Sequence, residues 1–186
     1  MWCGLHSSAV SYGDLGVLEF QLYVLESMRP PESFLAPALA ALGRTGPEML
    51  DASEAVGAAI RPMTGSPRRI TEILSGARWD MPSLEGPHIS VYALPLWPDF
   101  YFHVELMAEA DWIWCAEFRR HGARRPADRV APWEFVRGDL ADAFDAVEEV
   151  DLWSPYGSYS AHDRESGQRY FLRFGWGLLQ EMEAYR

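Results

Sequence analysis

The spacing of apolar residues predicts a strand near the start of the chain. Residues 17–27 alternate between apolar and polar side chains, which is the period of two that a half-buried strand shows. The apolar face of this strand would hold Leu18, Phe20, Leu22 and Val24. A helix is the alternative interpretation, since leucines also recur at heptad spacing, at Leu15, Leu18, Leu22 and Leu25. The neighbouring glycines and the β-rich composition favour the strand.

Three helices are predicted to follow, and each has recognisable end signals. Residues 30–43 start with two prolines and stop at a glycine, and residues 46–60 form the second helix. Residues 65–79 contain the third helix, with Ser66 as its N-cap, Pro67 in its first turn and Gly76 as its end.

The middle of the chain and its C-terminal part favour antiparallel strands. Short segments rich in aromatic and β-branched residues predict three consecutive strands, at residues 88–94, 100–107 and 112–118. Residues 157–175 predict a hairpin, and residues 176–186 predict a closing helix. Because helices are grouped and strands follow one another, the predicted fold class is α+β. We expect a single domain over residues 1–186, mainly an antiparallel sheet with helices packed on one face.

The most acidic stretch, residues 138–153, is predicted to be an amphipathic helix that starts at Asp139 as its N-cap. Its apolar face would hold Leu140, Phe144, Val147 and Val150. Its opposite side would carry a narrow acidic strip of Asp142, Asp145 and Glu149, flanked by Glu148. Acids near the C-terminal end of a helix are not favoured by the helix dipole, so local helix stability does not explain Glu148 and Glu149. The strip is expected to be solvated. Two interpretations remain: it is the solvent-exposed face of a soluble amphipathic helix, or it is a docking strip for a basic partner.

Composition is typical of a folded protein that stays in the cytoplasm. The chain has 186 residues, 48% of them hydrophobic, which suffices for a substantial core in one domain. No segment is apolar over the length of a membrane span, and the N-terminus lacks the basic and apolar regions of a secretory signal. The two cysteines are far apart and belong to no CxxC pair, so we expect no disulfide framework.

The charge of the chain is strongly negative and unevenly distributed. The net charge is −11, although residues 61–78 and 119–137 are rich in arginine. All 16 basic residues are arginine, which is typical of a high-GC genome and therefore of a bacterial or phage source. An acidic surface repels phosphate backbones, so direct binding to nucleic acid is not expected. The two arginine-rich segments are interpreted as loop charge or as partners of nearby acids.

Two short motifs place histidine beside groups that enzymes use. His88 and Ser90 resemble one H-x-[ST] motif of the two-histidine phosphoesterases, which need a second copy to supply both acid and base. The other copy, at His6, lies near the N-terminus. His103 and Glu105 resemble the H-x-E of zinc deaminases, but the P-C-x-x-C segment of that zinc site is missing. The sequence therefore predicts no catalytic residue, no metal site and no cofactor.

Aromatic residues leave one question open. Trp112 and Trp114 would share one face of a strand, and such a pair belongs either to the core or to a binding face.

Elimination and profile together predict a non-enzymatic protein that binds another protein. A small, acidic, aromatic-rich chain without catalytic motifs is typical of a bacterial immunity protein, which neutralises a toxin with a basic surface. The residues expected to bind this partner are Asp142, Asp145, Glu148, Glu149, Trp153 and Tyr156. One alternative is a phage-encoded inhibitor of a host nuclease complex, and another is a structural component of a larger assembly. A third is a small enzyme or ligand-binding domain whose pocket over the sheet is lined by His88, His103, Glu105 and Glu117, with Arg119 or Arg120 binding an anion.

Overall fold

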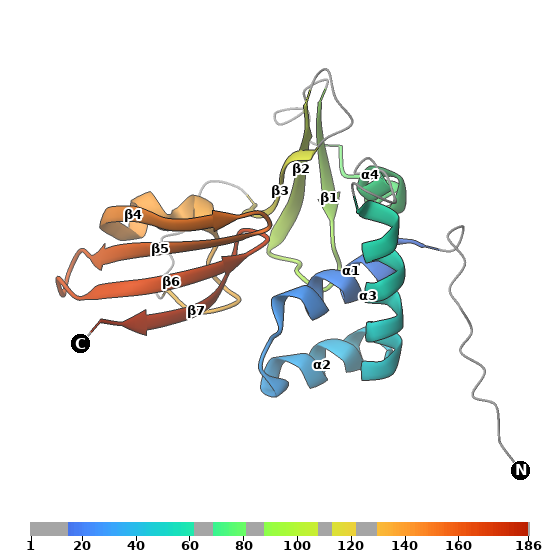
Figure 1. Ribbon diagram of the computed structural model, residues 1–186, viewed down its shortest axis with the longest axis horizontal. Helices are drawn as coiled ribbons and strands as arrows, with labels where there is room; N and C mark the ends of the chain where they lie inside the picture. Colours follow the sequence, from blue (N-terminus) through green and yellow to red (C-terminus); the bar gives the residue numbers. More distant parts are fainter. Residues whose placement is uncertain (1–14, 62–68, 81–87, 108–112, 122–129, 186) are drawn as a thin grey trace, which may run out of the picture.

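The computed structural model describes residues 15–61, 69–80, 88–107, 113–121 and 130–185. Helices cover one side of a three-stranded sheet, and a four-stranded sheet lies on the other side of the molecule (Figure 1). Both sheets are antiparallel. The predicted α+β class with antiparallel strands is confirmed, and the strands divide into two sheets where the sequence led us to expect one.

The first element is helix α1, Val17–Met28, so the predicted strand over residues 17–27 was wrong. The side chain of Glu19 accepts a hydrogen bond from the Gly16 backbone N–H at 3.0 Å, which fixes the helix N-terminus. The helix packs against α3 and against the sheet, so its buried positions extend around more than one narrow stripe: they are Phe20, Gln21, Leu22, Val24, Leu25 and Met28. Because so much of the helix surface is buried, its apolar residues fit both the period of two of a strand and heptad spacing.

The predicted helices after α1 are confirmed where the structure describes them. They are α2, Glu32–Leu42, α3, Gly46–Ile60, and the short α4, Arg69–Ile73, followed by the 3-10 turn η1, Ser75–Ala77. Thr45 caps α3 through a capping box with Glu48. The predicted N-cap Ser66 and Pro67 lie outside the described residues.

The three-stranded sheet consists of β1, Ile89–Ala93, β2, Phe100–Leu106, and β3, Ile113–Arg120, in that order. These strands agree with the predicted segments. Phe102 and Phe118 lie on the face that packs against α1, where Phe102 meets Phe20 edge to face at 5.3 Å. This face and the helices form the larger hydrophobic core of the described residues.

The four-stranded sheet follows the order β4, Phe144–Trp153, β5, Tyr156–Asp163, β6, Arg169–Gly175, and β7, Leu178–Ala184. The hairpin predicted over residues 157–175 is confirmed as β5 and β6. Asp163 opens its turn by accepting hydrogen bonds from the backbone N–H and hydroxyl of Ser166. The predicted C-terminal helix was wrong, because residues 178–184 pair with β6 and tertiary pairing overrides their local helix preference.

The acidic helix predicted within residues 138–153 was also wrong. Only the 3-10 turn η2, Arg137–Asp139, and one turn of helix α5, Leu140–Ala143, precede the strand β4. Asp139 is buried, and its carboxylate accepts a hydrogen bond from Arg120 Nε at 3.0 Å instead of capping the helix. Leu140 and Phe144 pack with Phe135 in the smaller core, on one face of the second sheet.

Hydrogen bonds at Ser27 and at Trp176 join the helical layer to the second sheet. The Tyr156 hydroxyl donates to the Ser27 backbone oxygen, and the Trp176 indole N–H donates to the Ser27 hydroxyl, at 3.0 and 2.8 Å. Trp176 also packs on Phe20 and Phe102 from the turn between β6 and β7. None of the helices that the structure describes has both the length and the hydrophobicity of a membrane span.

Candidate protein-binding surface

Strand β4 forms one border of the second sheet (Figure 1). Its side chains are exposed along almost its whole length. After the buried Phe144, residues 145–153 are all exposed. A border strand of a packed sheet usually buries every second side chain, so exposure on both faces is unusual. We call the exposed side chains of residues 145–156 the β4 surface.

Carboxylates occupy both faces of β4. In the register with β5, Glu149 pairs with the buried Tyr159, whereas Glu148 pairs with Ser160 on the opposite face. The predicted narrow strip of Asp142, Asp145 and Glu149 is therefore wrong in its geometry, because these acids belong to a helical turn and a strand. The predicted exposure of these acids is confirmed.

Two of the β4 carboxylates have arginine partners and two do not. Asp145 accepts from Arg164 Nε at 2.6 Å, and Glu148 lies 3.4 Å from an Arg169 nitrogen. In the described part of the chain, Glu149 and Asp151 form no ion pair. Exposed ion pairs contribute only about 0–1 kcal/mol to stability, so the acids of β4 add little to the fold.

Apolar side chains are concentrated on the same short segment. Among the described residues ten large hydrophobic side chains are exposed, and half of them lie on the β4 surface: Val147, Val150, Leu152, Trp153 and Tyr156. Trp153 is the most exposed, at 77%. Aromatic side chains in a hydrophobic cluster with a charged surrounding are the usual energetic centre of a protein interface. Trp153 and Tyr156 were predicted from the sequence as binding residues. Val147, Val150 and Leu152 were not, and the spacing of the two valines had placed them on the apolar face of a helix.

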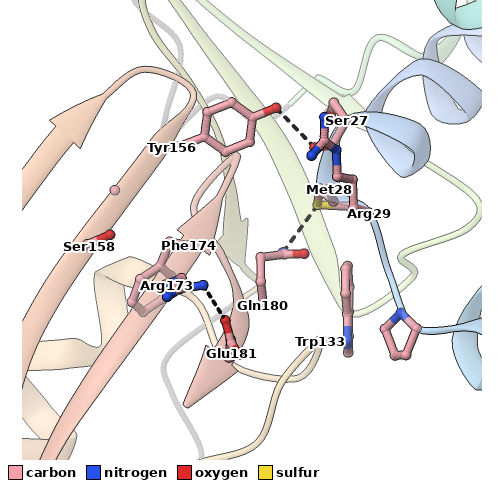
Figure 2. A pocket seen from close by; sticks show the side chains of 12 residues that line it. Ser27, Met28, Arg29, Trp133, Tyr156, Ser158, Arg173, Phe174, Gln180 and Glu181 are labelled. Atoms are coloured by element: carbon pink, nitrogen blue, oxygen red, sulfur yellow. Dashed lines mark hydrogen bonds and ion pairs between the residues drawn. The ribbon is translucent and has the colours of Figure 1, made fainter. Parts of the chain in front are cut away.

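Tyr156, at the end of the β4 surface, also lines a cleft at the end of α1 (Figure 2). This cleft has a volume of about 750 Å³ and extends from the last turn of α1 to β6 and β7. Figure 2 shows Tyr156 directed at Ser27 across the cleft, and the Arg173–Glu181 ion pair on its sheet side. The Tyr156 ring is thus held by its hydroxyl while remaining 43% exposed.

A second hollow, of about 370 Å³, adjoins the other side of Tyr156. Trp114 and Leu152 line its apolar part, and the Glu117–Arg137 ion pair lines its polar part. Trp114 is 69% exposed, so it does not belong to the core. Trp112 lies outside the described residues.

A buried carboxylate stands at the base of this second hollow. Glu117 accepts hydrogen bonds from Arg119 and Arg137, so one acid is shared by two guanidinium groups. Cys115 beside it is a free thiol, and burial and the charge of Glu117 raise its pKa, which keeps it protonated and unreactive at neutral pH. This arrangement explains part of the arginine-rich segment 119–137 as internal pairing, together with the Arg120–Asp139 pair.

The histidines of the alternative enzyme-like site do not meet. His103 is buried on β2, and its Nε2 lies 3.7 Å from Glu105 Oε2, which is longer than a hydrogen bond. His88 stands opposite Leu106 on the neighbouring strand, so it belongs to the other face of the sheet. Burial, and secondly the charge of Arg119, lower the pKa of His103 and favour its neutral form. No group of three or more potential metal ligands occurs among the described residues.

No protein-family model, curated protein or solved structure matches this chain.

Proposed function

We propose that this protein acts without catalysis, by binding a basic surface of another protein and blocking it. An immunity protein that neutralises a toxin is the form of this function that fits a small acidic chain best. The observation that carries the proposal is the β4 surface, where exposed apolar side chains and four carboxylates share one unburied strand.

The two kinds of side chain would have different tasks in such a complex. Trp153 and Tyr156 would supply the buried apolar area, because aromatic anchors contribute most of the binding energy in interfaces. The carboxylates around them would accelerate association with a basic partner and select against acidic ones. Glu149 and Asp151, whose charges no arginine of the described chain neutralises, would contribute most to this attraction.

A cross-linking experiment can identify the partner before its affinity is known. A photoreactive phenylalanine analogue replaces Trp153 in the full chain, and the same analogue replaces Leu50, which is exposed on α3, as the control. In cells that produce the protein, we expect a covalent adduct with one basic protein from position 153 and not from position 50. Adducts at equal yield from both positions would contradict a specific role for the β4 surface.

Charge reversal then tests the role of the acids against the partner so identified. We expect the double variant Glu148→Arg and Glu149→Arg to slow association by at least about tenfold at low salt. The matched control is Glu32→Arg with Asp51→Arg, which changes the net charge equally at exposed positions on α2 and α3. Association rates are measured by stopped-flow mixing, and an unchanged rate in the β4 variant would refute the proposal.

A further inference from the structure

In the described part of the chain the two sheets have four border strands, and three of these strands carry a covering segment. The outer side of β1 is covered by residues 78–79, since the Trp79 N–H donates to the Val91 oxygen at 2.8 Å. The outer side of β3 is covered at Phe118, whose N–H donates to the Trp176 oxygen at 2.6 Å. Covering unpaired backbone groups in this way is how sheets avoid pairing with other chains.

The border strand β7 is covered as well. Trp133 donates its N–H to the Leu179 oxygen at 2.8 Å, and Leu179 donates its N–H to the Phe135 oxygen at the same distance. Val136 and Leu178 form a further bridge there. The segment 133–136 thus behaves as a short additional strand beside the start of β7.

Strand β4 has no such cover in the part of the chain that the structure describes. Apart from its bonds to β5, the hydrogen bonds of its backbone to the described residues are both at its first residue: the Phe144 N–H donates to the Leu140 oxygen, and the Phe144 oxygen accepts from Arg164 at 3.4 Å. In an antiparallel strand every second residue directs its N–H and C=O away from its neighbour, so β4 presents free donors and acceptors along its outer side. The longest border strand is therefore the open one.

Charge excludes a second copy of this chain as the strand that covers β4. The strand carries Asp145, Glu148, Glu149 and Asp151 and no basic residue. Like charges placed opposite each other destabilise a pair of strands, and self-pairing would juxtapose these acids in either direction. The same acids are complementary to an extended segment that carries arginine or lysine on both of its faces.

We infer that β4 accepts an extended basic segment of the partner protein as a fifth strand of the second sheet. This inference rests on the proposed function and adds the mode of binding. Backbone hydrogen bonds supply affinity in such strand addition, and side chains at alternate positions supply selectivity. Register irregularities on either side of residues 146–149 limit the regular ladder to this segment, beyond which Leu152 and Trp153 offer side-chain contacts.

The first experiment uses the full-length protein and a short synthetic peptide in which pairs of arginines alternate with pairs of valines, so that both faces of the extended peptide carry arginine. The control peptide has the same side chains and charge but carries an N-methyl group on every residue, so it cannot donate backbone hydrogen bonds. Amide hydrogen exchange is followed by NMR. We expect the first peptide to slow exchange at alternate amides within residues 146–149 by about tenfold, and the methylated peptide to leave them unchanged. Equal protection by both peptides, or none by either, would overturn strand addition.

A pair of proline variants tests the same inference from the side of the protein. Adjacent N–H groups of a strand point in opposite directions, so either Ala146→Pro or Val147→Pro removes a bond to β5 and the other removes an outward N–H. Neither variant changes the charge. We expect one variant to lose stability, and the variant that keeps its melting temperature to lose peptide binding by at least about tenfold. Unchanged peptide binding in the stable variant would refute the inference, and Val147→Ala, which keeps the N–H, serves as the control.

The outcomes separate this inference from the proposed function. If charge reversal at Glu148 and Glu149 slows association with the partner while the peptide forms no hydrogen-bonded ladder, the partner docks through side chains alone. In that case only strand addition is refuted. If charge reversal leaves the rate of association with the partner unchanged, both proposals are refuted. If the protein alone dimerises through β4 at low salt, as sedimentation and loss of the dimer in the stable proline variant would show, the choice of a basic partner is wrong.

Discussion

Strands β2 and β4 are both rich in apolar residues, and the fold treats them in opposite ways. The first five residues of β2 are buried, and its neighbours β1 and β3 occupy both of its sides. In β4 all residues after the first are exposed, and among the described strands β5 alone pairs with it. Packing therefore accounts for the side chains of β2, whereas it accounts for those of β4 only at Phe144.

The difference separates side chains that the core requires from side chains that are available for function. Residues that the core requires are explained by stability, and exposed apolar residues beside unpaired carboxylates are not. In the described part of the chain, neither hydrophobic core contains the exposed apolar side chains of β4, which are Val147, Val150, Leu152 and Trp153.

The largest effect is expected from truncation of the β2 core. Phe102 is fully buried between Phe20 and Phe118, with ring centroids 5.3 and 5.1 Å away. Phe102→Ala should lower the free energy of unfolding by about 3–5 kcal/mol, because it leaves a cavity. Val147→Ala on β4 should change it by about 0.5 kcal/mol or less. Urea denaturation measures both, and similar losses would mean that β4 is covered in solution.

A smaller loss is expected where the border of β3 is covered. Gly177 has a φ of +77°, and a Cβ there would lie 2.8 Å from the Glu117 Cβ. Gly177→Ala should cost about 1–2 kcal/mol for the left-handed backbone and a further 1–3 kcal/mol, roughly, for the crowding. Gly167→Ala is the control, since its φ is +65° and no atom lies within 4 Å of the added Cβ. Thermal unfolding of the two variants isolates the crowding, and equal losses would argue against close contact at β3.

A pH dependence is expected from the buried histidine of β2. Burial lowers the pKa of His103 in the folded protein below its ordinary value of 6.5. The unfolded chain therefore binds the proton first, so stability is fully present above about pH 6.5 and falls as the pH decreases below it. Urea denaturation at pH 7.5 and 5.5 should show a loss in the wild type that is smaller in His103→Gln. Identical losses in both proteins would show that His103 does not titrate on unfolding.

The smallest effect is expected from neutralising the unpaired acids of β4. Glu149→Gln with Asp151→Asn should leave the free energy of unfolding within about 0.5 kcal/mol of the wild type, because both side chains are exposed and unpaired within the described chain. Urea denaturation at low salt checks this. A clear destabilisation would assign the acids to the fold, and the contrast between β2 and β4 would disappear.

The sequence predicted the segments whose local pattern and tertiary role agree. Helix α3 combines the Thr45 capping box with an apolar stripe, and the β5–β6 hairpin combines alternation with a turn that Asp163 opens. Both were predicted correctly because local preference and packing act in the same direction.

The wrong predictions arise where packing overrides a local period. A helical stripe fits the positions of Leu140, Phe144, Val147 and Val150. Only the first turn is helical, however, because the rest of the segment pairs with β5 as a strand. Residues 178–184 likewise have helix-forming side chains and become β7 through pairing with β6. The acids of the candidate site were found because exposure follows from charge in either structure. Their arrangement on two faces could not be predicted, since it depends on the strand register.

The hydrogen bond from Tyr156 to Ser27 has a consequence for the entropy of binding. An aromatic side chain that is fixed before a partner arrives does not lose rotamer freedom on contact, which saves about 0.5–1.5 kcal/mol for each immobilised residue. Tyr156 is preorganised in this sense, with its ring exposed and its hydroxyl already bonded to the end of α1. It provides a rigid reference point at the end of an open strand, against which an arriving chain can be aligned.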